Sequence, residues 1–170
     1  MTWGLPQSSF YNEEEFMNDI HAELMERLKK IAHRQSKSFC YGCYKEAPSG
    51  RCESCHSDDL MRFVPEVGVD WGCEWVIKHL VEQNLAPADL DEAFESSIES
   101  CYPEKTLLGW MEVSTIQAMK DYDRVSWDLA QSEWVSVEED EGHLISFDHG
   151  ASYFWQCDLE RYIEENESET

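Results

Sequence analysis

The chain has 170 residues, 42% of them apolar and 12% aromatic, so it can build a packed core and is not of the disordered class. Its 36 acidic and 13 basic residues give a net charge of −23, which repels phosphate backbones and anionic membranes and attracts basic surfaces. No run approaches the ~20 apolar residues of a membrane span, and the N-terminus lacks the pattern of a signal peptide, so we expect a cytoplasmic protein.

The acidic residues are unevenly distributed. Residues 1–62 contain 8 basic and 10 acidic residues, whereas residues 63–170 contain 5 and 26. We therefore predict three segments: an N-terminal amphipathic helix over 1–37, a zinc-binding module over 38–63 and an acidic α+β domain over 64–170.

The first predicted helix follows Asn12, which is a favourable N-cap, and three glutamates lie in its first turn. Apolar residues recur every three or four positions and form one stripe: Phe16, Ile20, Leu24, Leu28 and Ile31. Basic residues gather toward its end, at Arg27, Lys29, Lys30, Arg34 and Lys37. They complement the helix dipole, and this explanation needs no nucleic acid.

Residues 40–55, CYGCYKEAPSGRCESC, contain two Cys-x-x-Cys pairs eight residues apart. Each pair can direct two thiolates at one ion, so Cys40, Cys43, Cys52 and Cys55 are the predicted ligands of a tetrahedral zinc site. A closed Cys₄ shell leaves no position for substrate, which makes the predicted Zn²⁺ structural. Iron, disulfides and His56 as a substitute ligand remain alternatives.

Further helices are expected over 70–84, capped by Asp70, over 88–101, over 114–122, capped by Ser114, from Asp123 onward, and over 158–166. Residues 107–113 resemble a short strand, and residues 143–156 a hairpin around Asp-His-Gly. The predicted fold is α+β, with several helices packed on a small, mainly antiparallel sheet and an inserted Cys₄ zinc knuckle. Cys73, Cys101 and Cys157 are expected to be core residues.

The sequence contains no His-Glu-x-x-His, no glycine-rich phosphate loop and no Gly-x-Ser-x-Gly. The six histidines are scattered, and carboxylates are so numerous that their pairing carries no information. We therefore expect a binding protein with no small-molecule substrate, not an enzyme.

Acidic residues on the predicted helices recur at three- and four-residue spacing, which places a carboxylate every ~5–6 Å along one face. Several such faces can imitate the phosphate array of duplex DNA, which carries one charge per ~1.7 Å of axis. A surface of simply solvated charges is the alternative. The candidate partner-binding residues are Glu92, Glu95 and Glu99, and Glu138, Glu139, Asp140 and Glu141, with a further group at Asp158, Glu160, Glu164 and Glu165.

Four segments, SGRCESCHSDDLMR, GWMEVSTIQAMK, SWDLAQSEW and ISFDHGASYFW, resemble uncharacterised zinc-ribbon proteins of bacterial plasmids and integrative mobile elements. The resemblance covers most of residues 38–156 and brings no catalytic residues with it. It implies a mobile-element context, in which small acidic proteins blunt host restriction or CRISPR defences.

These observations together predict an acidic zinc-binding protein that inhibits a host nucleic-acid-binding defence enzyme by occupying its basic DNA or RNA site. Direct DNA binding is not expected. Two alternatives remain: a zinc-ribbon regulator that contacts nucleic acid, and an adaptor that binds a protein through its zinc module. The regulator would use Arg27, Lys29, Lys30, Arg34 and Arg51.

Overall fold

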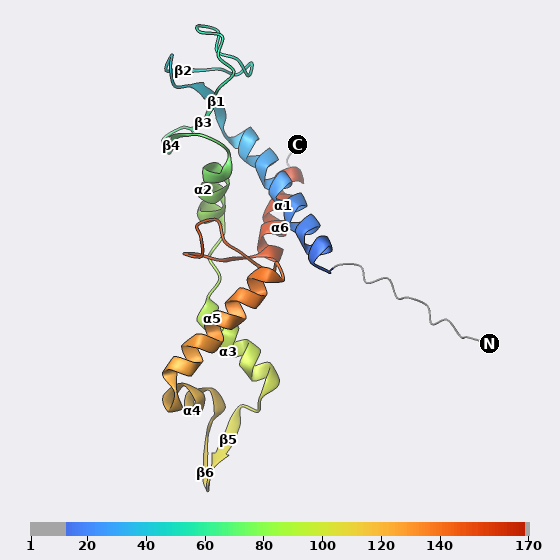
Figure 1. Cartoon of the computed structure of the whole chain (residues 1–170), viewed down its shortest axis with the longest axis vertical. Helices are drawn as coiled ribbons and strands as arrows, with labels where there is room; N and C mark the ends of the chain where they lie inside the picture. Colours follow the sequence, from blue (N-terminus) through green and yellow to red (C-terminus); the bar gives the residue numbers. More distant parts are fainter. Residues whose placement is uncertain (1–12, 169–170) are drawn as a thin grey trace, which may run out of the picture. The chain divides into compact units, whose positions relative to one another are not determined.

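The computed structural model describes residues 13–168, and within them it has six α-helices and eight short strands in three antiparallel sheets (Figure 1). The predicted α+β class is confirmed. The chain divides between Ile77 and Lys78 into two compact units, here called the N-terminal unit and the C-terminal unit. The three-segment organisation expected from the sequence stays a prediction.

The N-terminal unit begins with α1, Glu13–Gln35. Leu24, Leu28 and Ile31 of the predicted apolar stripe are buried, as their spacing indicated. The expected N-cap, Asn12, and the side chains of Phe16 and Ile20 lie outside the described residues.

A four-stranded sheet follows α1, in the order β2-β1-β3-β4. Its strands are β1 (Lys37–Cys40), β2 (Lys45–Glu46), β3 (Met61–Val64) and β4 (Gly68–Asp70), and all neighbours are antiparallel. Arg62 of β3 donates hydrogen bonds to the carbonyls of His33 and Ser36 and to the hydroxyls of Ser36 and Ser38. It thereby satisfies carbonyl groups at the C-terminal end of α1 and joins that end to the sheet.

Helix α2, Glu74–Asn84, begins four residues later than predicted. Asp70 was the expected N-cap, but it is the last residue of β4 and its carboxylate accepts a hydrogen bond from the Trp71 amide. The carbonyl of Cys73 accepts the first helical bond, from the Ile77 amide at 2.9 Å. Gly72, with φ of 73°, separates the strand from the helix because a left-handed residue can continue neither.

In the C-terminal unit, three helices surround an aromatic cluster: α3 (Leu90–Cys101), α4 (Thr115–Tyr122) and α5 (Arg124–Asp140). The Phe94 ring centroid lies 4.9 Å from that of Trp127 and 5.7 Å from that of Trp134. The predicted cap Ser114 and the predicted helix start at Asp123 are confirmed, and each side chain accepts an amide hydrogen bond in the first turn. The last helix is α6, Gln156–Ser168.

Two hairpins complete this unit. Strands β7 (Leu144–Ile145) and β8 (Phe154–Trp155) pair as expected from residues 143–156. Residues 107–113, predicted as one strand, instead span the end of β5 (Lys105–Leu108), a turn at Gly109 and Trp110, and the start of β6 (Met111–Ser114). The prediction was wrong because Gly109 adopts a φ of 67°, which reverses the chain direction.

The three cysteines outside the paired motif divide between core and surface. Cys73 is buried, as predicted, but Cys101 and Cys157 are exposed, so their predicted core role is wrong. Cys101 is the last residue of α3, beyond its packed turns. Cys157 lies two residues before buried Leu159, a spacing of about 200° that directs it to the opposite face of α6.

Candidate metal centre

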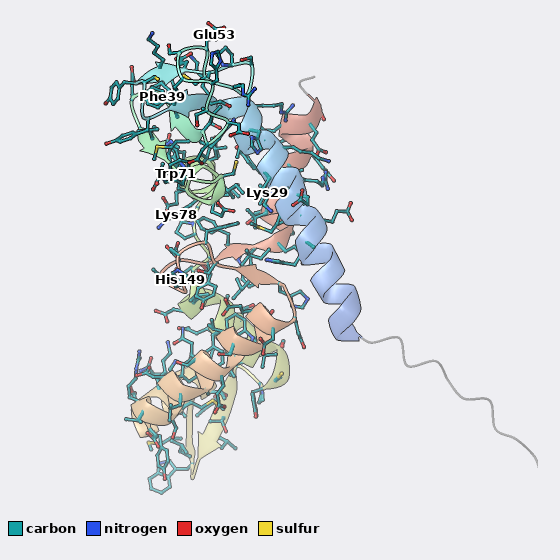
Figure 2. All side chains as sticks on the ribbon, turned by 45° about the horizontal axis from the view of Figure 1, so that its top comes forward. Lys29, Phe39, Glu53, Trp71, Lys78 and His149 are labelled. Atoms are coloured by element: carbon teal, nitrogen blue, oxygen red, sulfur yellow. The ribbon has the colours of Figure 1, made fainter. Side chains whose placement is uncertain are left out.

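Two turns of the N-terminal unit bring the paired cysteines together. Cys40 ends β1 and Cys43 lies in the turn to β2, whereas Cys52 and Cys55 belong to the loop before β3. Their four sulfur atoms all lie within 4.8 Å of one another, close enough to hold one metal ion. In Figure 2 the labelled residues Phe39, directly before Cys40, and Glu53, directly after Cys52, show where the two cysteine pairs lie.

The two turns share an uncommon backbone feature. Tyr44 and His56, each directly after the second cysteine of its pair, adopt φ of 56° and 60°. Only a few per cent of non-glycine residues have positive φ, so its repetition at matching positions indicates two copies of one turn. The second turn is closed by hydrogen bonds from the His56 amide to the Cys52 carbonyl and from the Cys52 amide to the Ser57 carbonyl, both 2.8 Å.

Backbone amides prepare one of the thiols for ionisation. Hydrogen bonds from the backbone of Cys55 and Ser54 lower the pKa of Cys52 to about 6, so that this thiol is largely ionised at neutral pH. Hydrogen bonding with the Cys55 and Cys52 side chains raises the pKa of Cys43 to about 12. Four thiols this close cannot all ionise without a cation, because like charges raise one another's pKa.

The geometry shows no disulfide at the site. The Cys40 and Cys55 sulfurs are 3.7 Å apart, well beyond the ~2.05 Å of an S–S bond, and all seven cysteines are free. Cys40 and Cys52 are buried whereas Cys55 is exposed, so one edge of the centre faces solvent. His56 is exposed and does not belong to the four-sulfur group.

The first predicted acidic row, on α3, is only partly free. Glu92 and Glu99 are exposed, but the Glu95 carboxylate forms an ion pair with Lys120 of α4. The Lys120 ammonium also lies 5.1 Å from the ring centroid of Trp127. Glu95 therefore helps to hold α3 and α4 together, and it is less available to a partner than the sequence suggested.

The second predicted acidic group, Glu138 to Glu141, lies at the end of α5. The Glu138 carboxylate lies 2.9 Å from Nδ1 of His143, and Glu139 accepts a hydrogen bond from the Tyr153 hydroxyl at 3.3 Å. Glu139, Asp140 and Glu141 are all exposed. Glu138, Glu141 and His143 also come within metal-binding distance of one another, but such clusters are common at surfaces without an ion.

The basic residues of the C-terminal unit are all engaged. This unit contains 23 acidic and five basic residues, a net charge of −18. Each basic side chain forms an ion pair with a carboxylate of the same unit: Lys78 with Glu82 and Asp148, Lys105 with Glu112, Lys120 with Glu95, Arg124 with Asp128, and Arg161 with Asp158. Most of the carboxylates therefore have no cation available within their own unit.

A cysteine–histidine contact in the N-terminal unit was not anticipated. The Cys73 sulfur lies 3.2 Å from Nε2 of His33, 40 residues earlier in the chain. Burial raises the pKa of Cys73 and lowers the pKa of His33, so both are neutral near pH 7. A neutral thiol is a weak nucleophile, and the contact has the character of packing, not of a catalytic pair.

No family model, curated protein or solved structure matches the chain. Among residues 13–168, no helix combines the length and the apolar character needed to cross a membrane. Any functional conclusion therefore depends on the four-cysteine cluster and on the charge of the two units.

Proposed function

We propose that this chain is a zinc-binding acidic inhibitor that occupies the basic DNA- or RNA-binding site of a protein, and that its target is a host defence enzyme of the restriction or CRISPR type. In this proposal the chain catalyses no reaction and does not bind DNA itself. Its acidic surface competes with nucleic acid for the same cationic groups of the target.

One observation supports the proposal above the others. All five basic residues of the C-terminal unit are paired internally, which leaves a folded surface with a large excess of carboxylates. Such a surface attracts a cationic groove strongly at low ionic strength and weakly when salt shortens the Debye length. The exposed carboxylates of Glu92, Glu99, Asp140 and Glu141 are the best placed to meet that groove.

Zinc is the proposed occupant of the four-cysteine cluster. Four thiolates arranged around one ion are typical of structural zinc sites. Bound Zn²⁺ supplies the positive charge that allows all four thiols to ionise. A shell closed by four sulfurs has no open position for a reacting group. In the proposed function the ion stabilises the module and takes no part in chemistry.

A second function, a zinc-ribbon regulator that binds nucleic acid, has one observation in its favour. Tyr41 and Tyr44 of the module are strongly exposed, and their ring centroids lie 6.2 Å apart. Exposed aromatic rings in a module that also contains Lys45 and Arg51 are suited to stacking on bases. The net charge of −5 of the N-terminal unit opposes this reading.

The two functions are separated by a mobility-shift assay and a plating assay. The inhibitor should not shift a duplex or single-stranded DNA probe at low salt, and its expression should raise the plating efficiency of phage on bacteria with a restriction or CRISPR system. The regulator should shift the probe, with loss of the shift in Tyr41→Ala, and should leave plating unchanged.

A matched pair of variants tests whether the location of the charge matters. Glu92→Lys with Glu99→Lys, in the C-terminal unit, should abolish protection of phage because it inverts part of the proposed contact surface. Glu53→Lys with Glu66→Lys changes the net charge equally in the N-terminal unit and should leave protection intact. Equal loss in both double variants would contradict a localised acidic contact, and no protection by the unaltered chain would contradict the proposed function.

A further inference from the structure

The β5–β6 hairpin ends in a two-residue turn with an exposed tryptophan. Leu108 pairs with Met111 across the hairpin, and Gly109 and Trp110 lie between them. Gly109 has φ of 67°, as the first central position of a type II′ turn requires, and Trp110 occupies the second position. The turn therefore places the Trp110 indole at the end of the hairpin, beyond the last pair of strand residues.

The whole tip is apolar and exposed. Trp110 is 92% exposed, and Leu107, Leu108 and Met111 are each more than half exposed. Single exposed apolar residues are ordinary, but four within five positions form a patch of the kind that marks an interaction site. Figure 1 shows β5 and β6 extending beyond α4 as a two-stranded arm.

The base of this hairpin is firmly held. The Thr115 amide donates to the Glu104 carbonyl at 2.9 Å, and the Thr115 hydroxyl donates to the Pro103 carbonyl. Thr115 itself is buried, so these bonds are sheltered from water. A hairpin fixed at its base presents Trp110 with little conformational freedom, which lowers the entropic cost of inserting it into a pocket.

The charge around the hairpin tip indicates what kind of partner binds it. Glu104, Lys105 and Glu112 flank the apolar residues, with the Lys105 ammonium 3.9 Å from the Glu112 carboxylate, and the unit as a whole has a net charge of −18. A second copy of the chain and an anionic membrane would both be repelled at contact distance. A protein pocket that is apolar at its centre and bordered by Lys or Arg side chains is complementary to this surface: its centre matches the apolar tip, and its border matches the negative charge around the tip.

We propose that the β5–β6 hairpin is a protein-docking element that inserts Trp110 into an apolar pocket bordered by basic residues on a partner protein. Trp110 is the anchor, Leu108 and Met111 contact the walls of the pocket, and the Glu104 carboxylate together with the excess negative charge of the unit faces the basic border. This inference does not rest on the proposed function, because the basic border need not be a nucleic-acid site.

The test begins with a photo-cross-linking amino acid in place of Trp110 in the full chain. The matched control carries the same group in place of Tyr122, which lies in the same unit and is 93% exposed. Each purified protein is irradiated in a bacterial lysate, and cross-linked products are identified by mass spectrometry. The proposal expects a product from position 110 that position 122 does not give.

The identified protein is then purified and titrated with the unaltered chain and with variants. Trp110→Ala should weaken binding by roughly 30-fold or more, the loss expected of an interface hot spot, and Tyr122→Ala should change it less than about threefold. Substitution of basic residues beside the cross-linked peptide should weaken binding as well. Unfolding midpoints of both variants should match the unaltered chain, because neither side chain is packed.

Four results of the cross-linking, binding and sedimentation experiments would overturn the proposal, and a fifth comes from vesicle binding. They are the absence of a product specific to position 110, equal affinity of Trp110→Ala and the unaltered chain, a cross-linked surface without basic residues, and a Trp110-dependent dimer in sedimentation. Binding to phosphatidylcholine or phosphatidylglycerol vesicles that Trp110→Ala abolishes would also overturn it, since it would assign the tip to lipid. Failure of phage protection alone leaves this inference standing, which keeps the two tests distinct.

Discussion

The two units of this chain differ in charge and in what holds them together. The N-terminal unit has eight basic and 13 acidic residues and four converging thiols. The C-terminal unit has a net charge of −18 and a core that includes the rings of Phe94 and Trp127. Strands of two to four residues, which both units contain, bury little apolar area. The proposed metal ion would stabilise the cysteine module of the N-terminal unit, whereas the C-terminal unit packs large aromatic side chains.

The comparison also shows where negative charge is tolerated. Carboxylates of the C-terminal unit stay on the surface of helices whose buried faces are apolar, so their repulsion acts through water and is screened. The four thiols of the N-terminal unit lie within 4.8 Å of one another, so all four can ionise only with a cation between them. Stability should therefore respond to different treatments in the two units.

The largest expected effect is loss of the metal. Cys52→Ser, or removal of the ion with a chelator, should release about one zinc per chain and destroy the fold of residues 38–63, because the strands there lack a sufficient core without the ion. Amide hydrogen exchange in β1 to β4 should accelerate by about 100-fold or more, while α3 and α5 stay protected. Cys101→Ser, at an exposed cysteine outside the cluster, is the control. A metal-free protein with full protection of β1 would contradict the assignment.

The opposite experiment removes an aromatic side chain from the C-terminal unit. Phe94→Ala should lower the free energy of unfolding of this unit by about 3–5 kcal/mol, because Phe94 is buried against Trp127 and Trp134. Zinc content should stay unchanged. Tyr122→Ala, at an exposed ring, should change stability by less than about 0.5 kcal/mol. Urea unfolding followed by circular dichroism measures both, and a loss of zinc in Phe94→Ala would show that the units are not independent.

A smaller effect with a distinctive pH dependence is expected at Asp148. Its carboxylate accepts hydrogen bonds from the amide and hydroxyl of Ser152 and from the Ser146 hydroxyl, and its pKa is lowered from 3.8 to about 2. A depressed pKa stabilises the folded state above the unfolded pKa, and this contribution is lost as the pH falls from about 4 to 2. Asp148→Asn should therefore be less stable than the unaltered chain at pH 6, and the difference should shrink at pH 2. A difference that is constant with pH would contradict the assignment.

The smallest effect is expected at a helix cap. The Asp89 carboxylate accepts a hydrogen bond from the Glu92 amide at 3.0 Å, so Asp89→Ala should destabilise the C-terminal unit by about 1 kcal/mol. Glu99→Ala, on the exposed face of the same helix, should lie within about 0.5 kcal/mol of the unaltered chain. Chemical unfolding of the two variants side by side measures the difference, and equal values would show that the cap does not matter.

Local patterns account for the features that the sequence predicted correctly. The Cys-x-x-Cys spacing brings two sulfurs to one side of a turn, and Ser114 and Asp123 cap helices, because these geometries involve residues only two to four positions apart. The buried stripe of α1 follows from its period for the same reason. Asp70 shows the limit: its side chain is a good cap, but pairing of β4 with β3 determined its conformation.

By itself, the sequence determined the composition of the two units, the spacing of the four thiols and the periodicity of the helices. Only the tertiary structure decided that Glu95 is engaged by Lys120, that Cys73 contacts His33, and that Trp110 stands exposed at a hairpin tip. The physical reason is the range of the interactions. Backbone geometry acts over a few residues and is encoded locally, whereas the Glu95–Lys120 ion pair and the Cys73–His33 contact depend on how segments 25 to 40 residues apart pack against one another.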